Sequence, residues 1–157
     1  MSSTNMYYFV CLQALQSPTN TDLVIHYQAF QAWLQTVEAS LAQMPSPLHI
    51  QYQPTQLFLI WPTSLELRSL VTAMTALSQH SYIAINQGAA IYDAKRQWYY
   101  STIPAQLTAF IEVGKHHQHS LVIGEQASHL LPNEQLIYLT RSYFAGATTA
   151  LEVYGWE

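Results

Sequence analysis

The amino-acid sequence predicts a single α/β domain of the α+β type with a ferredoxin-like core, in which helices pack on a mostly antiparallel sheet. The first observation is the order of the predicted elements: strand, helix, strand, strand, helix, strand, then additions. The second is the length of 157 residues, which is the usual size of one domain and can bury a core. The third is that no internal repeat, linker or low-complexity segment interrupts the chain. We therefore expect one domain over residues 1–157.

The first part of the chain predicts a strand and a long helix. An apolar and aromatic run at residues 7–15 is typical of a buried strand, and it stops at the turn-prone residues 17–20. Apolar residues then recur every three or four positions until Pro45 and Pro47 end the pattern. We expect an amphipathic helix whose core-facing side chains are Leu23, Tyr27, Phe30, Leu34, Val37 and Leu41.

Two short strands and a second helix follow. Residues 48–52 and 57–61 have the composition of strands, and the four residues between them suit a hairpin loop, so we expect antiparallel pairing. Ser64 can cap the next helix, which is expected to end near His80. Its buried face is predicted to consist of Leu67, Leu70, Val71, Met74 and Leu77.

The second half predicts a projecting hairpin and a closing set of short elements. The hairpin would join strands at 82–86 and 98–103 through a segment rich in turn-forming and charged residues. Pro104 can start a short helix that runs to Ile111. The remaining elements are expected to be a strand at 120–123, a short helix at 125–131, and strands at 135–140 and 151–156.

The amino-acid composition indicates which kinds of molecule this protein is expected to bind. Only 9% of the residues are charged and the formal net charge is −4, so the surface is expected to be weakly charged and prone to association. The five Lys and Arg residues are scattered, which leaves no basic stripe for nucleic acid. The single cysteine, Cys11, is expected to be a buried hydrophobe, which fits a reducing compartment. Without a secretory signal pattern or an apolar run near the ~18 residues of a membrane span, we expect a cytoplasmic protein that does not contact membranes.

Three segments of the second half resemble the class III adenylate and guanylate cyclase catalytic domain. Residues 83–90, Ile-Ala-Ile-Asn-Gln-Gly-Ala-Ala, are similar to that family's Gly-Ile-Asn-x-Gly strand. Residues 120–127, Ser-Leu-Val-Ile-Gly-Glu-Gln-Ala, resemble its Ile-Leu-Val-Ser strand and the short helix after it. Gly146 and residues 151–154, Leu-Glu-Val-Tyr, resemble its closing strand. The order and spacing carry the resemblance, which spans nearly the whole chain and implies a ferredoxin-like core with cyclase-type additions.

The resemblance implies a catalytic centre whose metal ligands are missing from this chain. Members of the family hold two divalent metals with two aspartates, one on the first strand and one in the turn of the following hairpin. The first position falls within Cys11, Leu12 and Gln13, and the second is matched by Pro54 and Thr55. Shifting either alignment by two or three residues still meets no carboxylate.

Other catalytic positions implied by the resemblance also lack the expected groups. The Asn and the Arg of the family's third helix correspond to Thr108 and Glu112. The base-selecting Lys and its partner correspond to positions near Gln51 and Tyr99. The metal-binding aspartates, the positively charged Arg and the base-selecting Lys are thus all missing together. We therefore expect a domain that is not an enzyme and that binds no metal or other cofactor.

Two surface features remain. His116, His117 and His119 form an imidazole-rich stretch, but ligands so close in sequence need a partner from elsewhere to surround a metal ion, so we interpret it as an exposed loop. The predicted arm carries Lys95, Arg96, Trp98, Tyr99 and Tyr100. The resembled family uses this arm in a head-to-tail dimer, and aromatic residues are enriched at interface centres, although core packing is the alternative.

Two functions remain open at this point. In the first, an inactive cyclase-like domain acts in signalling as a homodimer or as a regulator of another signalling protein, such as an active cyclase. In the second, the vestigial cleft between Leu12, Thr55 and Tyr99 senses a small ligand, for example a nucleotide bound without metal.

Overall fold

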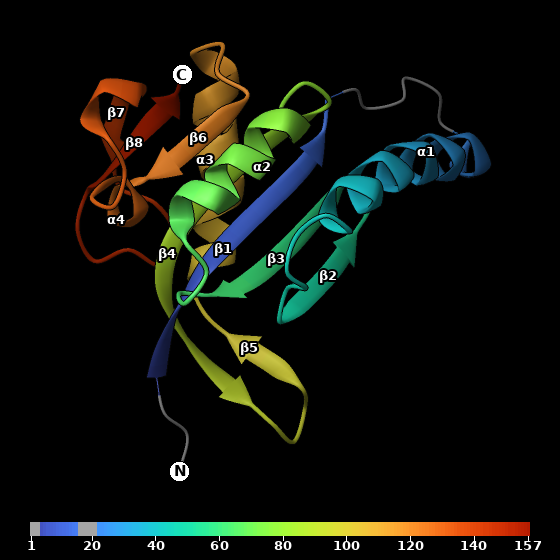
Figure 1. The fold of residues 1–157 in the computed structure, drawn as a ribbon, viewed down its shortest axis with the longest axis horizontal. Coiled ribbons are helices and arrows are strands. Elements are labelled where there is room, and N and C mark those ends of the chain that lie inside the picture. Colours follow the sequence, from blue (N-terminus) through green and yellow to red (C-terminus); the bar gives the residue numbers. More distant parts are fainter. Residues whose placement is uncertain (1–3, 16–21) are drawn as a thin grey trace.

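The computed structural model describes residues 4–15 and 22–157, and its elements confirm the predicted α/β class (Figure 1). The predicted turn at residues 17–20 lies outside the described residues. The elements are β1 (Thr4–Ala14), α1 (Leu23–Leu41), β2 (His49–Gln53), β3 (Gln56–Pro62), α2 (Leu67–Leu77), β4 (Ser81–Asp93), β5 (Trp98–Tyr100), α3 (Ile103–His116), β6 (Leu121–Gly124), α4 (Glu125–Ser128), the 3₁₀ helix η1 (Asn133–Gln135), β7 (Leu136–Ser142) and β8 (Leu151–Trp156).

One sheet organises the described elements. Its strand order is β2-β3-β1-β4-β6-β8-β7, with β5 paired to β4, and the described pairings are antiparallel except that of β4 with β6. The predicted hairpin of β2 and β3 is confirmed, with Gln53 opposite Gln56 and a turn made of Pro54 and Thr55. Thr55 has a φ of 66°, in the left-handed region that usually favours glycine.

Helices cover both faces of this sheet and create two apolar clusters. On β1, Tyr8 and Leu12 point to the same face and pack in the cluster that contains the α2 side chains. Phe9 and Cys11 point to the other face and pack in the cluster that contains the α3 side chains. The two-residue period of a strand therefore decides which helix each β1 side chain meets.

The first helix, α1, begins where predicted but buries less than expected. Asp22 is its N-cap and accepts a hydrogen bond from the Val24 N–H at 2.9 Å. Among the described residues of α1 only Val37 is fully buried, whereas Leu23 is 80% and Tyr27 60% exposed. The expectation that the whole apolar face belongs to the core is thus wrong. The N-terminal part of α1 projects past the strands (Figure 1), which agrees with the exposure of Leu23, Val24 and Ile25.

The second helix confirms its predicted buried face but not its predicted cap. All five expected side chains of α2 are buried. The N-cap is Glu66, and no side chain makes a capping hydrogen bond, so the expected cap at Ser64 is wrong. Instead, the Leu65 N–H bonds to the Pro62 carbonyl at 3.1 Å, which places Ser64 in a turn before the helix. The helix ends at Leu77, three residues before the expected end.

The projecting hairpin is confirmed, although its strands have other bounds than predicted. β4 continues through Gly88 and extends to Asp93, and the Ile103 side chain packs against the backbone at Gly88. A Cβ on Gly88 would lie 2.3 Å from Ile103 Cγ1. Ile103 therefore begins α3 rather than ending β5, and β4 and β5 form an arm that extends from the domain (Figure 1).

The closing elements agree with the sequence in type and approximate place. α3 is longer than the predicted short helix and continues to His116, while α4 stops at Ser128. β8 has the predicted bounds. None of the helices in the described parts of the chain is long and apolar enough to cross a membrane.

Candidate functional site

The structure divides the predicted site residues between the two faces of the sheet. Cys11 belongs to the α3 cluster and Leu12, its neighbour on β1, to the α2 cluster. Thr108 and Glu112 lie on α3, on the side of Cys11. The residues that the sequence placed in one cleft therefore face two different surroundings.

Cys11 and Thr108 are brought together in a neutral, buried environment. Cys11 is fully buried, and its thiol donates a hydrogen bond to Gln56 Oε1 at 3.3 Å. Burial raises the pKa of the Cys11 thiol to about 12, and a hydrogen bond with the Thr108 side chain offsets only part of that rise. A thiol held protonated is a poor nucleophile and a poor metal ligand, so the interpretation of Cys11 as a buried hydrophobe is confirmed.

Gln13 stands two residues further along the same face of β1. It lies in register with Gln56 on β3 and Tyr82 on β4, and its side chain is partly buried. Within the described residues, Gln13 Oε1 is buried and has no hydrogen-bond partner. This end of the cluster thus carries amides and no carboxylate among its described residues.

Glu112 is the one acidic residue among the predicted cleft positions, and it is already paired. Its carboxylate bonds to Lys115 Nζ at 3.2 Å, with 63% of the Glu112 side chain exposed. The same ammonium group lies 4.9 Å from the centre of the Tyr82 ring. The charge of Glu112 is therefore compensated at the surface and is not directed into a buried site.

Leu12 and Tyr99 cannot border one cleft. Leu12 is fully buried in the α2 cluster, whereas Tyr99 packs edge-on against Tyr7 at 5.3 Å on the other face. Tyr99 also contacts the rings of His49 and Tyr92, and the space beside it measures only about 20 Å³. The expected cleft between Leu12, Thr55 and Tyr99 is wrong, because β1 separates its proposed walls.

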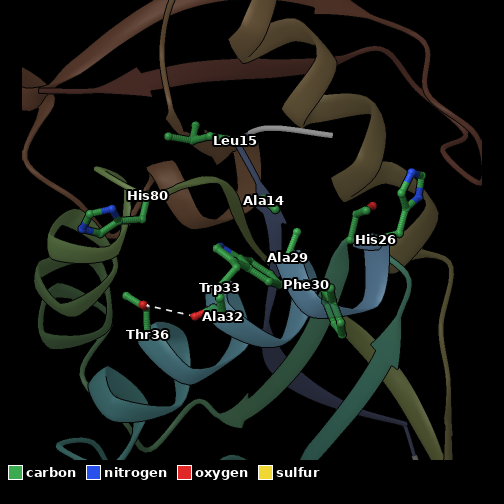
Figure 2. A pocket seen from close by; sticks show the side chains of 10 residues that line it. Ala14, Leu15, His26, Ala29, Phe30, Ala32, Trp33, Thr36 and His80 are labelled. Carbon is green, nitrogen blue, oxygen red and sulfur yellow. Dashed lines mark hydrogen bonds between the residues drawn. The ribbon is translucent and has the colours of Figure 1, made fainter. Parts of the chain in front are cut away.

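A larger hollow lies on the Thr55 side, against α1 (Figure 2). Its volume is about 460 Å³, and its lining includes Ala14, His26, Phe30, Trp33, Thr55 and His80. Sequence reasoning missed this hollow. The sequence places Phe30 on the predicted core face of the helix and assigns no role to His26 or Trp33, because periodicity does not show where a helix leaves the sheet.

The histidine stretch after α3 does not converge on one point. The His116 and His117 rings contact each other at 5.2 Å at the exposed end of the helix, while the half-buried His119 packs against Gly155. Across residues 4–15 and 22–157, no three His, Cys, Asp or Glu side chains are grouped as a metal site would require.

Comparisons with known proteins find relatives by fold and not by sequence. No family model matches the chain, and no curated protein matches it in sequence. The chain is similar in structure to the catalytic core of a rhodopsin-guanylyl cyclase with converted specificity in complex with ATPαS. Their TM-score is 0.74 at 7% identity, over 100% of this chain and 98% of that one. It is also similar to an adenylate/guanylate cyclase/hydrolase from Silicibacter pomeroyi, with a TM-score of 0.68 at 10% identity over 99% and 98% of the chains.

Some similar structures are longer than this chain. A bacterial light-regulated adenylyl cyclase matches 100% of it with a TM-score of 0.72 and 8% identity, but only 53% of that protein is covered. The chain thus spans about half the length of that structure.

Proposed function

We propose that this chain, which has the fold of a class III adenylate and guanylate cyclase catalytic domain, is catalytically inactive and acts in signalling through dimerisation or regulatory contact with another protein. The observation that carries the proposal is that neutral residues occupy both positions where the resemblance implies metal-binding aspartates.

The chemistry of those positions supports inactivity. Magnesium and manganese require anionic oxygen ligands, and two such ions stabilise the attacking and leaving groups in metal-dependent phosphoryl chemistry. This chain offers the Gln13 amide at the end of β1 and the Thr55 hydroxyl in the β2–β3 turn. Thr108 replaces the expected Asn, and Glu112 puts a negative charge where a cation is needed.

The arm of β4 and β5 supports the contact function. Trp98 is 47% and Tyr100 58% exposed, and their rings contact each other at 5.7 Å. Tyr99 faces inward, where its ring packs edge-on against Tyr7. At the turn, Arg96 is held by Asp93 at 2.8 Å, and Lys95 is exposed. A ridge of exposed aromatics beside a fixed cation has the composition of a protein interface.

Light scattering of the purified chain tests the contact function. We expect a dimer, and we expect the double variant Trp98→Ser/Tyr100→Ser to be monomeric and still folded, because both side chains are exposed. The matched control is Tyr138→Ser/Tyr143→Ser, which removes exposed tyrosines on and after β7 and should leave the dimer intact. A wild-type chain that is strictly monomeric and retains no cyclase in a pull-down would refute the proposal.

An activity assay tests the inactivity. Incubation with ATP or GTP and Mg²⁺ or Mn²⁺ should yield no cyclic nucleotide above a no-protein control. Metal-dependent formation of a cyclic product by the pure chain would overturn this part of the proposal.

A ligand-sensing role is the second candidate function, now on different residues from those first expected. The observation in its favour is the hollow of about 460 Å³ between α1 and the end of β1. Of the three residues expected to border the cleft, Thr55 lines this hollow, whereas Leu12 and Tyr99 do not.

A further inference from the structure

The hollow beside α1 has a wall that suits a flat ring. Phe30 and Trp33 lie on the α1 side with their ring centres 5.6 Å apart (Figure 2). The Trp33 indole is held in place because its N–H donates to Ser81 Oγ at 2.9 Å. Ala14, Ala29 and Ala32 line the same space, and their small side chains leave it open.

His26 supplies an unused hydrogen-bonding atom at the border of the hollow. Its Nε2 is buried and lacks a hydrogen-bond partner among the described residues. A buried polar atom without a partner is unusual in native proteins and indicates a missing partner. His26 lines both this hollow and the neighbouring one beside Tyr52, so this unpartnered nitrogen lies at the border between the two spaces.

The described residues that line the hollow include no Asp, Glu, Lys or Arg, and their two imidazoles belong to His26 and His80. A phosphate or carboxylate placed there would lose part of its hydration and would meet no Lys or Arg among the described lining residues, which is costly. An uncharged molecule meets no such penalty.

We propose that this hollow binds an uncharged, planar heteroaromatic molecule whose ring lies against Trp33 and whose ring heteroatom hydrogen-bonds to His26 Nε2. The inference rests on the ligand-binding role given above as the second function and adds the class of ligand, which excludes nucleoside phosphates.

Titration of the ¹⁵N-labelled full chain, followed by NMR, tests the ligand class. The probes are benzimidazole, benzimidazole-5-carboxylate and metal-free ATP. Benzimidazole should shift the Trp33 indole signal to saturation. The carboxylate should bind about tenfold more weakly or worse, since its charge finds no partner. ATP should not shift this signal.

Variants locate the site. Ala29→Leu places a larger side chain in the hollow and should abolish the benzimidazole shift, whereas Ala76→Leu, on the exposed side of α2, should preserve it. His26→Phe keeps an aromatic ring but removes the nitrogen, and should weaken binding about five- to tenfold.

The outcomes separate this inference from the function on which it rests. Equal or tighter binding of the carboxylate or ATP at the Trp33 signal would overturn the ligand class and leave ligand sensing standing. Benzimidazole binding that survives Ala29→Leu would overturn the location. If no probe shifts the Trp33 signal, both the ligand class and the sensing role are refuted, while the dimer measured by light scattering is unaffected.

Discussion

At the scale of single residues, the side chains of Cys11, Gln13 and Gln56 make the interior near the end of β1 neutral. Aspartates at that position would be charged and costly to bury unless an ion compensated them. The thiol of Cys11 and the amides of Gln13 and Gln56 are neutral, and Cys11 and Gln56 satisfy each other in part by a 3.3 Å hydrogen bond. These residue types are thus neutral, as the proposed loss of metal binding requires.

The titration of Cys11 makes a prediction at this scale. Its folded-state pKa of about 12 lies above the ordinary value of about 9, so the unfolded chain loses this proton first as the pH rises. The contribution of the protonated thiol to the free energy of unfolding is fully present below pH 9, and it is lost as the pH rises toward 12. Between pH 8 and pH 10 the free energy of unfolding should fall by about 1–2 kcal/mol more in the wild type than in Cys11→Ala.

Urea unfolding at both pH values measures that difference. The tyrosines contribute equally to the two proteins and cancel. Equal losses in wild type and variant would show that the thiol ionises normally in the folded state.

At the scale of elements, α1 and α2 differ in how many of their side chains are buried against the sheet. Five side chains of α2 are buried, whereas α1, among its described residues, buries only Val37 fully. Its side chains Trp33, Leu34 and Leu41 pack in part against the same cluster, and Trp33 donates a hydrogen bond to Ser81. We expect Leu23→Ser to change the free energy of unfolding by less than about 0.5 kcal/mol, because the side chain is 80% exposed. Val37→Ala should cost about 2 kcal/mol.

Urea unfolding of both variants checks this contrast, with Leu70→Ala in α2 as a buried control. A large cost of Leu23→Ser in the monomer would contradict the placement of the first turns of α1 in solvent.

The short helix α4 depends on one residue of β4. Asn86 is fully buried, donates to Gln126 Oε1 at 2.7 Å, and accepts from the Ala127 N–H at 3.1 Å. Asn86→Ala should cost about 1–3 kcal/mol, because the Ala127 N–H loses its acceptor. Gly124→Ala should also destabilise, since its Cβ would lie 2.3 Å from Asn86 Cγ.

A double-mutant cycle tests this contact. The cost of Gly124→Ala should shrink in the Asn86→Ala background, where the obstructing side chain is gone. Additive costs would mean that the two residues do not oppose each other across the strands.

At the scale of the whole molecule, the low charge connects the fold with its proposed use. The two ion pairs within the described residues, Asp93–Arg96 and Glu112–Lys115, each include a largely exposed partner and contribute little to stability. Exposed aromatics and aliphatics instead occupy the arm and the start of α1. A weakly charged surface with apolar projections favours association, which is the property that the light-scattering experiment measures.

Much of this architecture could be predicted from local patterns. The periods of β1 and α2, the β2–β3 hairpin and the bounds of β8 were all recognisable, because hydrophobic spacing reports the geometry of a strand or helix directly. The lack of carboxylates near Cys11 and Thr55 is likewise a property of composition, which no folding changes. The long β4 was missed because Gly88 signals a turn locally, while the Ile103 side chain that requires a glycine there comes from a distant segment.

By itself, the sequence determined the order of the elements, the buried side of α2 and the neutrality of the positions where metal ligands were expected. Only the tertiary structure decided that Leu12 and Tyr99 lie on opposite faces, that the start of α1 remains exposed, and that a hollow forms between Trp33 and Thr55. The reason is physical: periodicity shows that a side chain faces one way, but whether anything covers it depends on segments far apart in the chain.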